Sequence, residues 1–494
     1  MSYLLSISIG PVQDFIAAAR RTADLYAGSQ TLQELSKVAA QHLASKDAEL
    51  IFPADKDADG ANKILAQAEG DPKGLAEGAK KAVQEKLHQL WKDTIGKLPQ
   101  EYRSQIDQAR AKEQLDHFLE FYAAWVPLVK ESEYPKARLA VERLLAGRKA
   151  LRDFGPTHQQ DDGVPKSVLD PARAAVIDPR NWSEANIELK EGTYRPLRIK
   201  PTEYLDAVSL LKRCYGALKS DKVVDTRTMA RRSWKPEAEP DERYGEDDDH
   251  IQEPQPYLAI LVADGDRMGE LISRQDDPEA HRQLSKSLDG FAQKARAIVP
   301  KYRGFMVYSG GDDVLAFLPV NRAVACAKEL SEAFRHQVKG TLSAGIAIVH
   351  YREPLSLSLE RARAAEKAAK NGGRNALAVA LHTRGGSPIT VVQRWDELSW
   401  DELLEAYQNR KITRGLAHEL HKLVLEWQDD MRADYLYKEA QRVLARKEAR
   451  DLKIPPPTSD TPTYRKELLT FVEQLIIARF LSGIKEEAHA GTGA

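Results

Sequence analysis

The chain of 494 residues is poor in cysteine and contains only Cys214 and Cys326. Two thiols exclude both a disulfide framework and a four-cysteine zinc site, and they suit a reducing compartment. The sequence also lacks an apolar run of about 18 residues and a signal-peptide pattern, so it offers no segment that would span a membrane. We therefore expect a cytoplasmic protein with no structural zinc and no membrane partner.

An excess of charge of one sign is absent as well. Lys and Arg number 73, Asp and Glu number 74, and the formal net charge is −1. Because no global basic field attracts nucleic acid, any contact with RNA must be local or made by partner subunits.

The most informative stretch that is present reads Gly-Gly-Asp-Asp, at residues 310–313. Apolar runs flank it, and the paired glycines Gly310 and Gly311 supply the positive φ of a tight hairpin turn. Two like charges about 4 Å apart repel by roughly 4 kcal/mol at an effective dielectric of about 20, and a bound divalent cation reverses the sign of that energy. Asp312 and Asp313 therefore indicate a metal site, and the alternative for this turn alone is a solvated hairpin.

Two other stretches favour the metal site. Residues 257–263 form a buried type of strand that runs into Asp264 and Asp266, and α/β proteins collect ligands at such strand ends. Downstream, the strand expected at 342–349 is followed by a helix and by Lys-Asn-Gly-Gly-Arg-Asn at 370–375. A lysine, two glycines and an arginine at a helix end suit a polyphosphate.

These motifs together resemble a known family. Asp264-x-Asp266, the Gly-Gly-Asp-Asp turn, Ser343-x-Gly345 and the 370–375 string are similar to the Palm core of nucleotidyl cyclases and GGDEF-type diguanylate cyclases. With Ile-Gly-Pro-Val-Gln-Asp-Phe-Ile at residues 9–16, the chain resembles the large subunit of type III CRISPR effector complexes, most closely the Cmr (III-B) kind. The resemblance covers nearly the whole chain.

The resemblance implies an antiviral nucleotidyltransferase that makes cyclic oligoadenylates from ATP by 3′–5′ phosphodiester formation when the effector complex holds a target RNA. Its partners would be the other subunits of that complex and, through them, guide RNA and target RNA. The family's nuclease domain carries a His-Asp doublet. None of the 12 histidines here is followed by Asp, so we expect no such nuclease.

The same resemblance implies roles for individual residues of the second Palm. Two divalent cations, Mg²⁺ or Mn²⁺, would be held by the Gly265 carbonyl and by the carboxylates of Asp264, Asp266, Asp312 and Asp313. Nucleotide-binding residues would be Lys370 and Arg374 on the triphosphate, with Gly310, Gly311, Gly265 and Ser309, the last as a candidate base or ribose contact.

The order of expected elements occurs twice along the chain. Strands and helices between residues 3 and 128 follow a βαββαβ order, the ferredoxin-like plan, and residues 257–349 repeat it. We expect an α+β protein with two ferredoxin-like Palm domains and helical middle and C-terminal domains. Their ranges are 1–146 for the first Palm, 147–252 for the middle domain with an acidic linker, 253–385 for the catalytic Palm and 386–494 for the C-terminal helical bundle.

The first Palm has Ser8-Ile9-Gly10 where the second has Asp264-Gly265-Asp266, so we expect it to be inactive. Two other functions stay open at the level of sequence. One is a stand-alone GGDEF-type cyclase that uses GTP as a homodimer. The other is a non-catalytic scaffold that joins the RNA-binding subunits.

Overall fold

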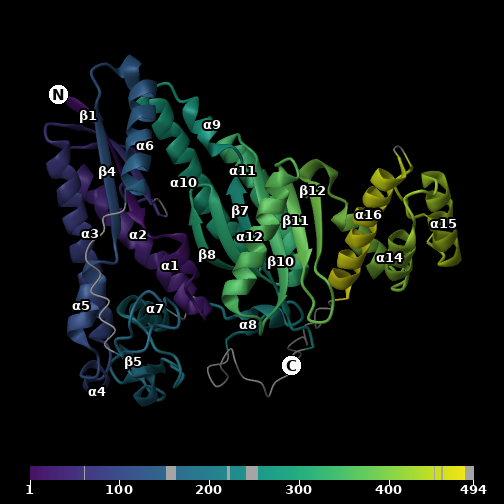
Figure 1. Ribbon diagram of the computed structural model, residues 1–494, viewed down its shortest axis with the longest axis horizontal. Coiled ribbons are helices and arrows are strands. Elements are labelled where there is room, and N and C mark those ends of the chain that lie inside the picture. Colours follow the sequence, from purple (N-terminus) through teal and green to yellow (C-terminus); the bar gives the residue numbers. More distant parts are fainter. Residues whose placement is uncertain are drawn as a thin grey trace, which may run out of the picture.

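The computed structural model describes residues 1–59, 62–151, 163–219, 223–240, 254–449, 451–457 and 460–483 (Figure 1). The N-terminal Palm is an antiparallel sheet with the strand order β2-β3-β1-β4. Its elements are β1 (Ser2–Gly10), α1 (Gln13–Ala17), α2 (Thr22–Ala44), β2 (Glu49–Phe52), β3 (Lys63–Glu69), α3 (Pro72–Ile95), α4 (Gln100–Arg103), α5 (Gln108–Asp116) and β4 (Glu120–Pro127). The expected βαββαβ order is confirmed.

The second Palm sheet has the order β12-β11-β10-β7-β9-β8. Read from β8, its first four strands are β8-β9-β7-β10, which correspond to β2-β3-β1-β4 of the first Palm. Its central strand β7 is almost wholly apolar, which suits a strand buried on both faces. The elements are β7 (Tyr257–Gly265), α9 (Met268–Ser273), α10 (Pro278–Lys301), β8 (Phe305–Gly310), β9 (Asp313–Leu318), η4 (Val320–Arg322), α11 (Ala323–Val338), β10 (Leu342–His350), α12 (Leu355–Asn371), β11 (Ala376–Leu381) and β12 (Ile389–Arg394).

The two Palms pack against each other through equivalent elements. Helix α2 of the first Palm contacts β8 of the second, and α10 of the second contacts β2 of the first. The rings of Tyr26 and Phe305 contact each other at a tilt of 53°, and the Ala54 N–H donates to Ser285 Oγ at 2.9 Å. Apolar residues of both Palms share one core, so the two sheets form a single body (Figure 1).

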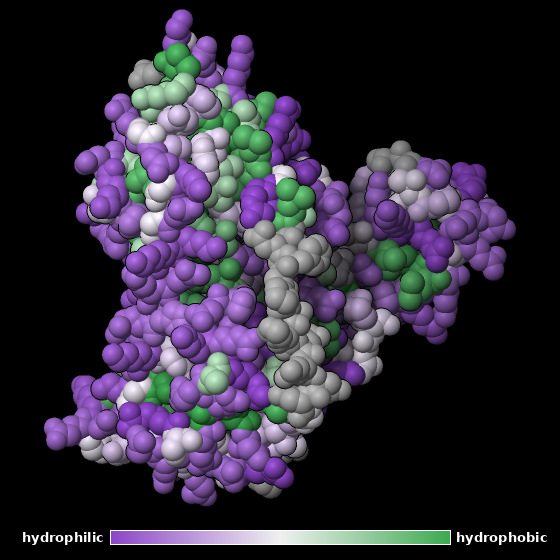
Figure 2. Space-filling model, turned by 60° about the vertical axis from the view of Figure 1, so that its left-hand side comes forward, coloured by the Kyte–Doolittle hydropathy of each residue, from purple (hydrophilic) through white to green (hydrophobic). Residues whose placement is uncertain are grey.

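Helix α6 (Tyr134–Ala150) follows β4 and packs on β1 and β4. It therefore belongs structurally to the first Palm, although it runs past residue 146, where we expected that domain to end. Large exposed apolar side chains lie on or beside it: Val129, Leu139, Leu144 and Leu151. The molecular face in Figure 2 is mostly hydrophilic, with hydrophobic residues showing in patches between the hydrophilic ones.

The middle region is less helical than expected. It contains α7 (Ala207–Leu218) and α8 (Thr226–Arg231), but also the strand pair β5 (Asn186–Lys190) and β6 (Thr193–Pro196). Alternating strand residues around Gly192 at φ 75° explain this hairpin. Helix α7 is fastened to α2 by the buried Arg213 guanidinium, which pairs with Asp24 at 2.9 Å and Glu203 at 2.7 Å. The acidic run 246–249 lies outside the described residues.

The C-terminal region holds η5 (Trp395–Glu397), α13 (Trp400–Gln408), α14 (Leu416–Glu426), α15 (Ala433–Arg446) and α16 (Thr461–Ser482). The helical bundle does not start at residue 386 as expected, because β12 at 389–394 pairs with β11 and still belongs to the second Palm sheet. Within the part of the chain that the structure describes, no helix is both long and apolar enough to cross a membrane.

The contact of α12 with β10 yields a stability prediction. A Cβ added to Gly345 on β10 would lie 2.0 Å from the Glu366 backbone nitrogen on α12. Gly345→Ala should therefore destabilise the protein by about 1–3 kcal/mol, because helix and strand must separate. Urea denaturation should show this as a lowered midpoint.

The matched control is Gly269→Ala on α9, where an added Cβ would have no atom within 4 Å. This variant should keep or slightly raise the midpoint, since alanine favours a helix over glycine by about 0.5–1 kcal/mol. Equal midpoints for the two variants would contradict the close packing described above.

Candidate functional site

Three carboxylates meet at one edge of the second Palm sheet. Asp264 lies at the C-terminal end of β7, and the antiparallel pairing of β7 with β9 brings the start of β9 to the same edge. One oxygen each of Asp264, Asp312 and Asp313 lies within 4.8 Å of the others. The structure thus brings together the three carboxylates that the sequence motifs singled out.

The turn that carries Asp312 is a two-residue hairpin loop. Gly310 pairs with Asp313 across β8 and β9, and Gly311 adopts φ 76°, which glycine reaches without strain. Gly265 permits the close approach of this turn to β7, because an added Cβ would lie 3.0 Å from the Asp312 Cβ. Gly311 therefore shapes the site through its positive φ, and Gly265 through its small size.

The electrostatics of the turn suit a divalent cation. Burial raises the pKa of Asp312 to about 6. Burial, with repulsion from Asp312 and Glu366, raises the pKa of Asp313 to about 7. Carboxylate oxygens are the hard ligands that Mg²⁺ and Mn²⁺ prefer, and a dication close by would relieve this repulsion. The residues present therefore fit a site for these metals.

Helix α12 supplies the positive charge next to the three carboxylates. Lys370 Nζ forms an ion pair with Asp264 and a second one with Glu366 at 2.7 Å. Burial and the neighbouring Arg374 lower the pKa of Lys370, so two cations lie close enough to repel each other, an arrangement that a phosphate would relieve. Sequence reasoning missed Glu366, although its spacing of four residues from Lys370 on one helix is a signal for such a pair.

Asp266 is not part of the carboxylate cluster, contrary to its expected role as a metal ligand. Its side chain is 4% exposed and accepts hydrogen bonds from Thr341 Oγ1 at 2.8 Å, Ser343 Oγ at 2.7 Å and the Asn375 N–H at 2.9 Å. It thereby fastens the 370–375 segment to the ends of β7 and β10. The serine of the Ser343-x-Gly345 motif therefore serves to hold the Asp266 carboxylate.

Arg374 lies in an exposed turn in which Gly373, Arg374 and Asn375 all have positive φ. The hydrogen bond from the Asn375 N–H to Asp266 fixes the backbone of this turn, and so fixes where the Arg374 side chain begins. Ser309, in contrast, is 1% exposed, and its Oγ has no hydrogen-bond partner. Such burial does not fit a residue that contacts a ribose from solvent. The role as a base stays a prediction, as does the Gly265 carbonyl ligand.

A bridge connects the Gly-Gly-Asp-Asp hairpin to the first Palm. The Arg296 guanidinium on α10 donates to the Ser309 carbonyl at 3.1 Å and pairs with Asp59 of the first Palm at 3.1 Å. Asp59 also pairs with Lys37 on α2 at 2.8 Å. Displacing the first Palm would therefore pull on the strand that leads into the turn.

The first Palm keeps a counterpart of Lys370. Helices α6 and α12 each follow the fourth strand of their Palm and each have 17 residues, with Lys149 and Lys370 one residue before the end. Lys149 Nζ contacts Ser8 Oγ at 3.3 Å, as Lys370 contacts Asp264. The first Palm thus has a lysine in the place that corresponds to Lys370 and a hydroxyl in the place that corresponds to the Asp264 carboxylate.

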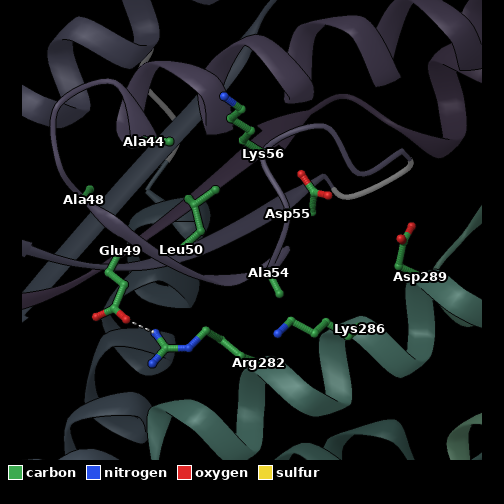
Figure 3. Close-up of a pocket in the computed structure, with 10 residues that line it drawn as sticks. All are labelled: Ala44, Ala48, Glu49, Leu50, Ala54, Asp55, Lys56, Arg282, Lys286 and Asp289. Carbon is green, nitrogen blue, oxygen red and sulfur yellow. Dashed lines mark ion pairs between the residues drawn. The ribbon is translucent and has the colours of Figure 1, made fainter.

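A separate recess of about 660 Å³ lies between the Palms and is shown in Figure 3. Arg282 of α10 pairs there with Glu49 of β2 at 2.8 Å, and the side chains of Lys56 and Lys286 lie on its rim (Figure 3). Its lining contains none of the residues of the carboxylate site.

Comparison with known proteins identifies the regions that hold the two Palm sheets. The model for the Cas10/Cmr2 second palm domain matches residues 257–378, and that for the N-terminal region of the CRISPR-associated protein Cmr2 matches residues 4–126. These two ranges are similar to the Cas10/Cmr2 family. The matched second palm range contains the three clustered carboxylates and Lys370. The family resemblance read from the sequence is therefore confirmed.

One curated relative is the CRISPR system Cmr subunit Cmr2 of Pyrococcus furiosus, which is 32% identical over 203 residues. The alignment covers 34% of this chain and 23% of that protein. The chain thus matches less than a quarter of the length of this Cmr2.

Solved structures match the fold over nearly the whole chain. The apo type III-B Cmr-beta structure matches with a TM-score of 0.66 and 12% identity, over 98% of this chain and 82% of its own. The Csm1–Csm4 cassette, solved in complex with cA4 and in complex with one ATP, matches with a TM-score of 0.55 in both cases. Identity is 16% and 17%, over 96% of this chain and 70% of that one. At these identities the likeness establishes the fold alone.

The raised pKa values lead to a prediction about pH and metal. Without metal, the ionised forms of Asp312 and Asp313 are disfavoured in the folded protein, so their contribution to stability is present at low pH. It is lost as the pH rises from 3.8, the ordinary pKa of an aspartate, through about 7. Added Mg²⁺ should therefore raise the melting temperature more at pH 8 than at pH 5.5.

The control is the isosteric double variant Asp312→Asn with Asp313→Asn, in which neither side chain ionises. Its melting temperature should respond to Mg²⁺ equally weakly at both pH values. A wild-type response that is larger at pH 5.5 would contradict the metal site.

The different positions of Asp264 and Asp266 lead to a second prediction for this site. Asp264→Asn should abolish the rise in melting temperature on adding Mg²⁺, whereas Asp266→Asn should keep it. Asp266→Asn should instead lower the metal-free stability by about 1–3 kcal/mol, because the three hydrogen bonds from Thr341, Ser343 and the Asn375 N–H would no longer go to a charged carboxylate. Loss of the Mg²⁺ response in Asp266→Asn alone would restore Asp266 as a ligand.

Proposed function

We propose that this protein synthesises cyclic oligoadenylates from ATP as a subunit of a type III CRISPR effector complex. The observation that carries the proposal is the convergence of Asp264, Asp312 and Asp313 beside Lys370, at the edge of a cyclase-like Palm sheet. The Csm1–Csm4 cassette, a structural relative, has been solved with cA4 and with ATP, which supports this substrate class.

In the proposed reaction, the 3′-hydroxyl of one ATP attacks the α-phosphate of another. A new P–O bond forms, the bond between the α- and β-phosphates breaks, pyrophosphate leaves, and the hydroxyl proton passes to solvent. Repetition lengthens the chain, and attack of its own 3′-hydroxyl on its 5′ α-phosphate closes the ring. Mg²⁺ or Mn²⁺ held by the three carboxylates would activate the hydroxyl and stabilise the leaving pyrophosphate.

The protein's own residues position the reactants. Lys370 and Arg374 would bind the triphosphate of the ATP that is attacked, since both cations lie at the end of α12 next to the carboxylates. In the first Palm, Lys149 occupies the position equivalent to Lys370 and would bind the phosphates of the attacking nucleotide. The side chain of Asp266 would keep the turn around Arg374 in place.

Control by partner subunits is part of the proposal. Because Arg296 ties the Gly-Gly-Asp-Asp hairpin to Asp59, a partner that moves the first Palm could bias the site toward its active arrangement. The exposed side chains of Leu139 and Leu144 on α6 offer an apolar surface for docking on that Palm. A shift from about 1% to 99% of the active state needs roughly 5.5 kcal/mol. Assembly in the cytoplasm follows from the same proposal.

Product analysis tests the proposed function. The reconstituted effector complex with ATP, Mg²⁺ and matching target RNA should yield cyclic oligoadenylates, detected by mass spectrometry. Asp312→Ala with Asp313→Ala should leave assembly intact and reduce the product by more than a thousandfold, since catalysis depends on the bound metal. Product within tenfold of wild type would contradict the assignment.

Two further measurements separate the alternatives. The isolated chain should be nearly inactive, whereas robust turnover of GTP by a homodimer would favour a stand-alone cyclase. A complex that assembles on RNA but makes no nucleotide product, with or without the Asp312 and Asp313 substitutions, would favour a scaffold.

A further inference from the structure

Glu366 on α12 is a mostly buried carboxylate beside the three that cluster at the sheet edge. Its side chain is 14% exposed, and its Oε1 lies 2.7 Å from Lys370 Nζ. It is not one of the clustered residues, yet its charge contributes to the raised pKa of Asp313. Burial and repulsion from Asp266 raise the pKa of Glu366 itself. A carboxylate in these surroundings costs free energy, so packing alone does not account for it.

The first Palm shows which side chain this position takes where no carboxylate cluster lies nearby. Four residues before Lys149 on α6 stands Leu145, and four residues before Lys370 on α12 stands Glu366. Leu145 is 4% exposed and packs in an apolar cluster with residues of the first Palm sheet. A leucine is thus sufficient to pack the helix on its sheet, and the glutamate of α12 has another role.

The Lys370 ammonium is shared between two carboxylates. It pairs with Asp264 Oδ2 and with Glu366 Oε1, and among the residues that the structure describes these are its ion-pair partners. A divalent cation at the carboxylate cluster would bind Asp264 as well, and two cations on one carboxylate repel each other. Metal binding would therefore displace Lys370 from Asp264 and leave Glu366 as its partner.

We propose that Glu366 is a positioning residue for Lys370: when Asp264 binds metal, Glu366 keeps the lysine ammonium at the site, where it binds the triphosphate. The inference rests on the proposed function, which assigns Lys370 to the triphosphate of the attacked ATP. An ammonium has three N–H donors, so it can bind Glu366 and a phosphate oxygen at once. A glutamate four residues before a lysine is also the favourable order for such a pair on a helix. Without Glu366, the flexible lysine would lose more rotamer freedom on binding nucleotide, which weakens the affinity.

Calorimetric titration of an ATP analogue tests the coupling between the two side chains. The analogue has a methylene bridge between its α- and β-phosphates, so it binds to the full chain with Mg²⁺ but does not react. Glu366→Gln should weaken binding about five- to twentyfold, because a neutral amide holds the ammonium less firmly than a carboxylate. In a Lys370→Ala background the same substitution should not weaken binding, since a residue that acts through the lysine has no such effect once the lysine is gone.

Two further variants separate positioning from stability and from the loss of a charge elsewhere. Glu366→Leu copies Leu145 of the first Palm, so it should weaken binding of the analogue at least as much as Glu366→Gln without lowering the melting temperature. Glu426→Gln is the matched control, since Glu426 pairs with Lys422 four residues away on α14 of the C-terminal region. This control should leave the affinity for the analogue unchanged.

Four results would each overturn the proposal. They are no binding of the analogue to the wild-type chain, unchanged or tighter binding to Glu366→Gln, equal weakening by Glu366→Gln in both backgrounds, and equal weakening by the Glu426→Gln control.

Kinetics of the reconstituted complex separate this inference from the proposed function. Glu366→Gln should raise the KM for ATP about five- to twentyfold and change kcat less than about threefold, because Lys370 would bind the triphosphate both before and during the reaction. A fall in kcat with an unchanged KM would contradict the role of Glu366. A wild-type complex that makes no product would refute the proposed function, whereas product without coupling in the titrations would refute only the role of Glu366.

Discussion

Repulsion between three half-buried carboxylates is the constraint on which the second Palm depends. Asp264, Asp312 and Asp313 meet within 4.8 Å, and burial alone already shifts two of them toward their neutral forms. Lys370 of α12 offsets this repulsion by pairing with Asp264. The small size of Gly345 lets α12 pack closely on β10, which places that lysine near Asp264. A bound dication would supply the remaining compensation.

The duplicated Palm gives the second level of organisation. The first long helix of each Palm packs on the second strand of the other: α2 contacts β8, and α10 contacts β2. This packing places the first Palm against the second, although its strand end carries Ser8 where the second Palm carries Asp264. In the proposed function, Lys149 would bind a nucleotide and the Arg296 bridge would transmit control from the first Palm.

Sequence periodicity predicted most of the fold, because apolar runs such as those around the Gly-Gly-Asp-Asp turn are buried strands in the structure. It failed at one domain boundary. We expected the second Palm to end at residue 385, yet β12 beyond it still pairs with β11. The β5–β6 hairpin escaped notice because its strands are short and half-exposed.

The clustered carboxylates could be predicted because each stands at the end of a strand whose pairing follows from the ferredoxin-like order. Asp266 could not be assigned correctly. Its spacing from Asp264 gives no sign that the chain leaves the strand after Gly265 and turns this side chain toward Thr341 and Ser343. Glu366 looked like one more charged residue on an amphipathic helix, and only the packing of α12 places it beside Asp313.

The most direct test of the central claim is anomalous X-ray diffraction from crystals grown with Mn²⁺ and a non-hydrolysable ATP analogue. The account predicts two anomalous peaks about 3.5–4 Å apart. Both peaks should contact the carboxylates of Asp264, Asp312 and Asp313, with Asp266 still bonded to Thr341 and Ser343 and Lys370 moved from Asp264 to a phosphate. An anomalous map without a peak at these three carboxylates, while the analogue is bound, would contradict it.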